Sequence, residues 1–161
     1  MAVNAQNDQD KKIITDAENA KDTLLAKDLG LEKFFKNASG YAIFPNVGKG
    51  ALILGGASGN GVVYENGKTI GMTSLKKVNI GLQGGGQSLI EVIFFETEEA
   101  LNKFKEANYE FSAEVSAVIS DEGKSKNANY NDGVVIFTFT KGGLMADASV
   151  GGQKFEYHAF K

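Results

Sequence analysis

The sequence predicts an α+β fold: a mainly antiparallel curved sheet or barrel-like sandwich, with N-terminal helices packed on it and one helix near 97–107. Two observations carry this prediction. Before Gly40 apolar residues recur every three or four positions, whereas after it short apolar or alternating runs follow one another. The turns between these runs are short and rich in glycine, which leaves no room for crossover helices and favours antiparallel pairing.

The helical part comes first in the 161-residue chain. In DQDKKIITDAENAKDTLLAKDLG the helix-spaced apolar positions are Ile13, Ala17, Ala20, Leu24 and Leu25. Gly30 is a stop signal for this helix. The following LEKFFKNASG predicts a short second helical turn with Phe34 and Phe35, which ends at Gly40. Residues 1–9 are interpreted as a flexible N-terminal segment, and residues 10–161 as one domain.

Strands are predicted from the runs that follow Gly40, namely YAIFP, ALILGG, GVVYE, KTIGMT, KVNIGLQ, SLIEVIFF, FSAEVSAVI, GVVIFTFT, GLMADASV and QKFEYHAF. The segment TEEALNKFKEAN interrupts them as a helix, with Thr97 as N-cap and two acidic residues in its first turn. The polar stretch 120–132 lacks either period and is predicted to be a mobile loop.

The stretch ENGKT, residues 65–69, contains the Gly-Lys-Thr of a phosphate-binding loop. Such a loop also needs a glycine five positions before Gly67 and a helix after it. Val62 occupies that position, and the residues after Thr69 alternate like a strand. Asn66-Gly67 between two strand-like runs instead predicts a two-residue type I′ hairpin. The glycine clusters 55–61 and 81–87 are expected between strands, as turns, bulges or places where backbone approaches backbone.

The composition argues against several kinds of chemistry. Cysteine is absent, which excludes disulfides, thiol nucleophiles and thiolate metal sites. All 17 basic residues are lysines, so no guanidinium fork is present for nucleic-acid recognition. The single histidine, His158, falls on the polar face of an alternating strand, without a second histidine or a nucleophile beside it. We therefore expect no enzyme, no cofactor, no metal site and no nucleic-acid partner.

The charge pattern also bears on membrane binding. The net charge is −3, and the first 40 residues carry six lysines against seven carboxylates. Global attraction to an anionic bilayer is therefore weak, and local lysine pairs must supply any attraction. Val3-Asn4-Ala5 before Gln6 is similar to the small-residue end of a secretory signal, although an ordinary terminus explains it equally well.

Four separated blocks, in order, resemble the SYLF domain family of lipid-binding proteins. They are SGYAIFPNVGKGALILGGASGNGVVY (39–64), VNIGLQGGGQSLIEVIFF (78–95), TEEALNKF and GGLMADASVGGQKF (142–155). The resemblance implies a non-enzymatic domain that binds membrane lipids, with bacterial members typically exported. Some eukaryotic members also bind actin filaments. This chain lacks arginine and any attached recognition module, which favours the bacterial stand-alone type.

Together these arguments predict a phospholipid or membrane-surface partner and an exported, periplasmic or cell-envelope location, with a cytoplasmic location as the alternative. The candidate lipid-binding residues are Phe34, Phe35, Lys49, Lys76 and Lys77, the last two at an expected strand-connecting turn. Core packing of both phenylalanine rings is the competing interpretation. The competing function is a structural or protein-interaction domain of the envelope.

The hairpin interpretation of ENGKT gives the first testable prediction. Lys68→Ala is expected to leave ATP affinity unchanged, because a hairpin turn offers no phosphate cradle and the parent chain should bind no ATP. Isothermal titration calorimetry of both proteins checks this expectation. ATP binding that disappears in the Lys68→Ala variant would contradict it.

Overall fold

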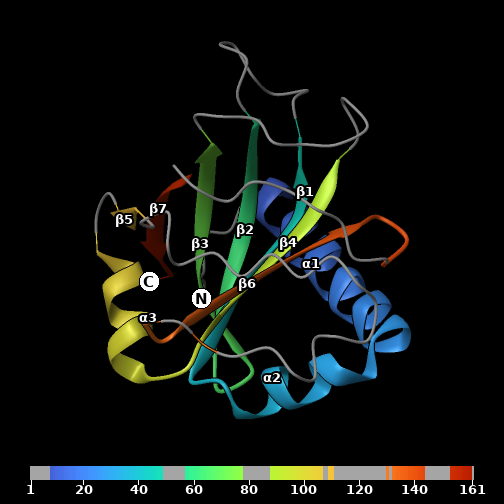
Figure 1. Cartoon of the computed structure of the whole chain (residues 1–161). Coiled ribbons are helices and arrows are strands. Elements are labelled where there is room, and N and C mark those ends of the chain that lie inside the picture. Colours follow the sequence, from blue (N-terminus) through green and yellow to red (C-terminus); the bar gives the residue numbers. More distant parts are fainter. Residues whose placement is uncertain are drawn as a thin grey trace.

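The computed structural model describes residues 8–48, 57–77, 88–106, 109–110, 130, 132–143 and 153–160 (Figure 1). Over these residues seven strands form one sheet in the order β5-β7-β3-β2-β1-β4-β6, and every described pairing is antiparallel. The strands are β1 Gly40–Val47, β2 Ala57–Glu65, β3 Lys68–Lys77, β4 Leu89–Phe95, β5 Tyr109–Glu110, β6 Val134–Thr140 and β7 Gln153–Ala159.

The helices form where the sequence predicts them. Helix α1 spans Asp8–Lys27, a 3-10 turn spans Leu29–Leu31, α2 spans Glu32–Asn37 and α3 spans Glu98–Lys105. The chain leaves α1 at Asp28, whose carboxylate accepts a hydrogen bond from the Gly30 amide at 3.0 Å. The Thr97 hydroxyl caps α3 by accepting from the Ala100 amide at 3.1 Å, as expected for an N-cap threonine.

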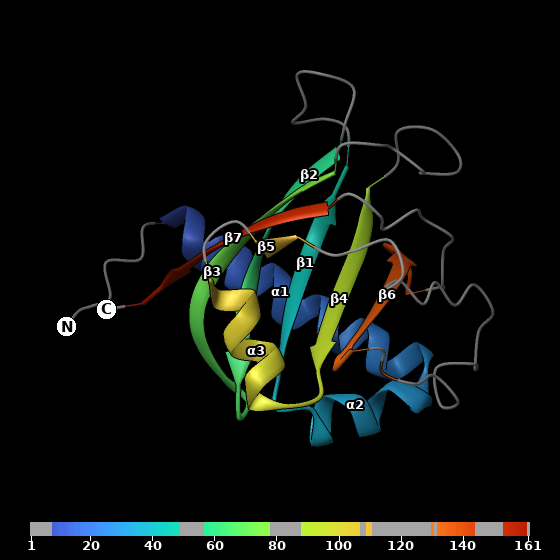
Figure 2. The ribbon, with the colours of Figure 1, turned by 60° about the vertical axis from the view of Figure 1, so that its left-hand side comes forward.

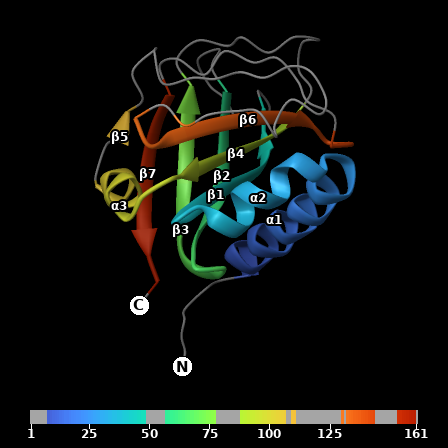
Figure 3. The same cartoon turned by 60° about the horizontal axis from the view of Figure 1, so that its bottom comes forward.

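The sheet is covered on both faces. Helices α1 and α2 lie together on one face, and α3 lies against the other (Figures 2 and 3). The α1 side of the core includes Leu24, Phe94 and Phe137, whereas the α3 side includes Phe95 and Phe104. The α+β class with N-terminal helices on a curved antiparallel sheet is therefore confirmed. The sheet is open and not closed into a barrel, and β5 and β6 are its outer described strands.

Aromatic rings fill the space between α2 and the sheet. The Phe34 ring lies 5.3 Å from the Phe94 ring and 5.4 Å, edge to face, from the Phe137 ring. Phe35 makes edge-to-face contacts at 4.9 Å with both Tyr41 and Phe94. Because such pairs add to the gain from burial, this cluster fixes the short α2 helix on the sheet.

The ENGKT hairpin is confirmed. Asn66 and Gly67 have φ angles of 54° and 78°, the left-handed conformations that a type I′ turn requires. Glu65 and Lys68 then face each other as the last pair of β2 and β3. Lys68 therefore begins a strand, and no helix follows it in the described chain up to residue 77.

Two predicted boundaries are wrong in the same region. The glycine-rich stretch 55–61 was predicted to separate strands, but residues 57–61 already belong to β2. A Cβ on Gly59 would lie 2.6 Å from the Asn46 carbonyl oxygen, and one on Gly61 would lie 2.6 Å from that of Ile43. The position between strands is therefore wrong, but the expected close approach of backbone to backbone holds for these glycines, which lie against β1.

The second correction concerns β3, which runs unbroken from Lys68 to Lys77. The predicted turn at Lys76-Lys77 is therefore the end of a strand. The predicted strands over 51–56 and 111–119 lie outside the described residues, as do all but the first residue of those over 77–83 and 143–150 and most of the polar stretch 120–132.

Tyr64 carries a buried hydroxyl under α1. Its ring stacks on Tyr41 with 4.9 Å between centroids, and the residue is 4 % exposed. The hydroxyl has no hydrogen-bond partner among the described residues. Burial raises the pKa of Tyr64 well above its ordinary value, and Glu18 and Tyr41 act in the same direction.

Gly61→Ala is expected to destabilise the fold by about 1–3 kcal/mol, because the new methyl group must displace a backbone carbonyl of the paired strand. Gly142→Ala is the matched control, since its Cβ meets only the Thr140 hydroxyl at 3.9 Å. The control should change the free energy of unfolding by about 0.5 kcal/mol or less. Urea denaturation measures both, and equal midpoints would refute the close-approach argument.

Stability is expected to fall as pH rises above about 10, where tyrosines of the unfolded chain ionise. The folded chain keeps Tyr64 protonated and therefore binds more protons than the unfolded chain, so the free energy of unfolding decreases with pH. Tyr64→Phe removes this group and should move the alkaline unfolding midpoint to higher pH. Circular dichroism across the alkaline range tests it; an unchanged midpoint would contradict the expectation.

Candidate functional site

Lysines gather at one end of the sheet. In the strand register Lys76 of β3 pairs with Ser58 of β2 on one side and with Lys154 of β7 on the other. Both lysines are exposed, whereas their chain neighbours Leu75 and Phe155 point into the α3 side of the core. Since side chains alternate along a strand, Lys76 and Lys154 stand on the α1 face.

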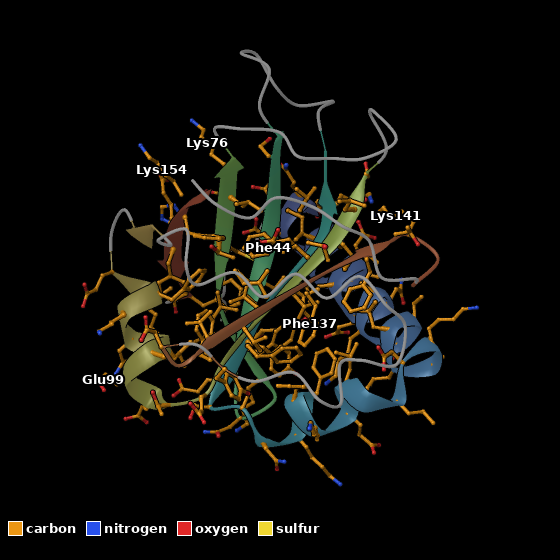
Figure 4. The ribbon with its side chains drawn as sticks, viewed as in Figure 1. Phe44, Lys76, Glu99, Phe137, Lys141 and Lys154 are labelled. Carbon is orange, nitrogen blue, oxygen red and sulfur yellow. The ribbon has the colours of Figure 1, made fainter. Side chains whose placement is uncertain are left out.

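A third lysine reaches the same end from β6. Lys141 follows β6 directly, and its ammonium group donates to the Pro45 carbonyl and to the side-chain oxygen of Asn46. These contacts join the ends of β1 and β6, which are separated in the sheet by β4. Figure 4 shows Lys76 and Lys154 close together at the upper left and Lys141 apart from them at the right; because all three stand at the same end of the strands, we call these three residues the lysine end.

A groove lies between α1 and the sheet beside the lysine end. Its main part has a volume of about 430 Å³, and a neighbouring part that Lys141 also lines has about 340 Å³. Both parts share Lys12 and Asp16 of α1, whose side chains form an ion pair at 2.9 Å. The sheet contributes Ser58, Asn60, Ser74 and Lys76. We call this space the α1 groove.

Carboxylates lie both on α3 and near the lysines. The first turn of α3 carries Glu98 and Glu99, and Glu99 lies far from the lysine end in Figure 4. Nearer to the lysines, Glu156 of β7 lies 3.8 Å from the imidazole of His158, and both side chains are mostly exposed. Acidic side chains therefore stand beside the lysines at this end of the sheet as well as on α3.

Comparison with known proteins identifies the family of this chain. Residues 76–159, just over half of the chain, match the family described as Ysc84, Las17-binding protein actin regulator. The chain belongs to the SYLF (Ysc84) family. The match begins at Lys76 and includes Lys141 and Lys154, whereas α1 lies outside it.

A curated relative extends the similarity of this SYLF chain toward its N-terminus. Beta cell expansion factor A of Aeromonas veronii is 32% identical over 145 residues, which is 89% of this chain. The aligned region is 55% of that protein, so the SYLF chain spans about half the length of its relative. The matched family is one of binding proteins, and no enzyme family is matched.

The predicted lipid-binding residues of this SYLF domain are scattered. Lys76 lies in the α1 groove, whereas Lys49 and the side chain of Lys77 lie outside the described residues. Phe34 is 4 % exposed and packs in the aromatic core, and Phe35 is half-buried beside it. Core packing thus accounts for both rings, and any contact of Phe35 with lipid stays a prediction.

Sequence reasoning missed several residues of the site. Lys154 could have been found, because alternation in QKFEYHAF already puts it on the polar face and β7 pairs with β3. Lys12 stands in a lysine pair with Lys11 that is visible in the sequence, but only the tertiary fold brings it to Lys141, which gave no signal. Glu91 is a separate case, an isolated charge in an apolar strand. It is 0 % exposed, lies between Phe44 and Thr138 in the register, and does not line the α1 groove.

The described residues also bear on a metal site and on a membrane-spanning helix. No group of three or more His, Cys, Asp or Glu side chains among these residues is placed to hold a metal ion. None of the described helices combines the length and the apolar character that crossing a bilayer requires.

Proposed function

We propose that this SYLF domain is a non-enzymatic module that binds the surface of an anionic phospholipid membrane through its lysine end. The observation that carries the proposal is the pairing of Lys76 with Lys154 at the end of the sheet where Lys141 also stands, beside a groove with a fourth lysine. The carboxylates of α3 lie away from this end. The domain can therefore turn its cationic end toward a negative surface.

The magnitudes support a modest, salt-sensitive attraction. Each lysine near an anionic bilayer contributes about 1 kcal/mol, and the effect fades within a Debye length of about 8 Å at physiological salt. Because the net charge is −3, a uniform distribution of charge would not attract the protein to such a surface. Binding must come from the local cluster.

The family description names actin regulation, and the relative's name refers to beta cells. Neither name is carried over to this chain. A protein-interaction domain of the envelope is the alternative function, and an exported location remains part of the proposal. Failure to bind vesicles would favour that alternative.

The double variant Lys76→Ala/Lys154→Ala should weaken binding to phosphatidylglycerol vesicles by roughly thirty-fold at low salt, since two lysines near the surface contribute about 2 kcal/mol. The difference should shrink as salt is added, because exposed charges are screened. Co-sedimentation with vesicles measures both effects, with phosphatidylcholine vesicles as the uncharged reference.

The charge-matched control is Lys36→Ala/Lys68→Ala. Lys36 lies on α2, and Lys68 begins the same strand that ends near Lys76, about 26 Å away at the rise of a β-strand. This control should bind as the parent does. Equal losses in the two double variants would show a nonspecific charge effect and reject the lysine end as the binding surface.

A further inference from the structure

The α1 groove unites charged groups from separate parts of the chain. Lys12 and Asp16 stand on α1 as an ion pair at 2.9 Å. Lys141 enters from the end of β6 and holds Asn46 through its side-chain oxygen. Each of these four residues lines the groove, so a ligand there would meet all of them.

The charges in this space act on one another. Burial is the main cause that lowers the pKa of Lys141; Lys12 lowers it further, and Asp16 opposes the change. Asp16 pairs with Lys12, and the Lys141 ammonium group adds a further positive charge to the same groove. The Lys12 side chain is 75% exposed, so it can rotate toward a ligand without losing buried contacts.

The floor of the groove consists of neutral hydrogen-bonding groups and one further lysine. Asn60 and Ser74 are partners in the register of β2 and β3, and Ser58 and Lys76 form the next row on the same face. Amides and hydroxyls both donate and accept, so they suit the hydroxyl groups of a polyol. Lys76 adds a charge that suits phosphate.

We propose that the α1 groove binds a phosphate ester whose alcohol part carries hydroxyl groups. Lys12 and Lys76 bind the phosphate, while Asn60 and Ser74 bind the hydroxyls. Lys141 is a positioning residue: it orients Asn46 and offsets the charge of Asp16, so that Lys12 is not fully neutralised by its ion pair.

The size of the groove fits such a ligand. Small-molecule sites range from about 300 to 1,000 Å³, and the main part of the groove has about 430 Å³. A glycerophospholipid headgroup and a free phosphorylated polyol share this chemistry. The inference rests on the proposed function only if the source is a lipid, and the experiment separates the two.

The direct test is an NMR titration of the whole chain with sn-glycerol 3-phosphate. Saturable shifts confined to the amides of Asn46, Ser58, Asn60 and Ser74 are expected, with inorganic phosphate binding more weakly because it lacks the hydroxyl groups. Equal affinity for inorganic phosphate, or shifts spread over lysines at both ends of the sheet, would overturn the proposal.

Variants then test the assigned roles. Lys12→Ala should weaken binding of glycerol 3-phosphate by about tenfold, the loss of one charged hydrogen bond. Asp16→Asn should strengthen binding, because it removes a negative charge from the groove. Lys68→Ala, far along β3, should change nothing. Weaker binding by Asp16→Asn would contradict the assigned anion site.

Asn60→Ala identifies the source of the ligand. If this variant loses affinity for both glycerol 3-phosphate and phosphatidylglycerol vesicles, the groove receives a lipid headgroup. A loss for glycerol 3-phosphate alone assigns the groove to a free phosphate ester. If the parent binds vesicles but not glycerol 3-phosphate, the groove proposal fails while the membrane proposal stands.

Discussion

Burial of β4 on both faces is the constraint on which the rest of the structure depends. All seven residues of this strand are buried, so the sheet needs a layer on each side. Helices α1 and α2 supply one layer through Leu24 and Phe34, and α3 supplies part of the other through Phe104. Because a polar group buried in these layers without a partner costs free energy, the groups available for binding stand where the layers end, at the strand termini beside α1.

Much of the fold follows from local physics and could be predicted. The change from a helical to a strand period, the Thr97 cap and the Asn66-Gly67 turn each depend on a few neighbouring residues. The boundaries that were wrong depend on distant ones. Gly61 looks like a turn residue until the carbonyl of Ile43 is known to lie against it, and that contact forms only in the folded sheet.

The site was less predictable than the fold for the same reason. Lys76 was found because it stands in a visible lysine pair, and the register alone shows that Lys154 is its neighbour. Lys141 binds a carbonyl 96 positions away in the chain, which no local pattern reveals. Phe34 and Phe35 were ambiguous in sequence, since an adjacent aromatic pair is compatible with a core and with an exposed surface alike.

The pairing of Lys76 with Lys154 sets two like charges on adjacent strands. Like charges directly opposite each other destabilise a sheet, so this pair lowers the stability of the folded chain. Selection for thermal stability alone would replace one of them, as surface-charge optimisation commonly does. If related chains keep both lysines, a requirement other than folding stability must have selected them.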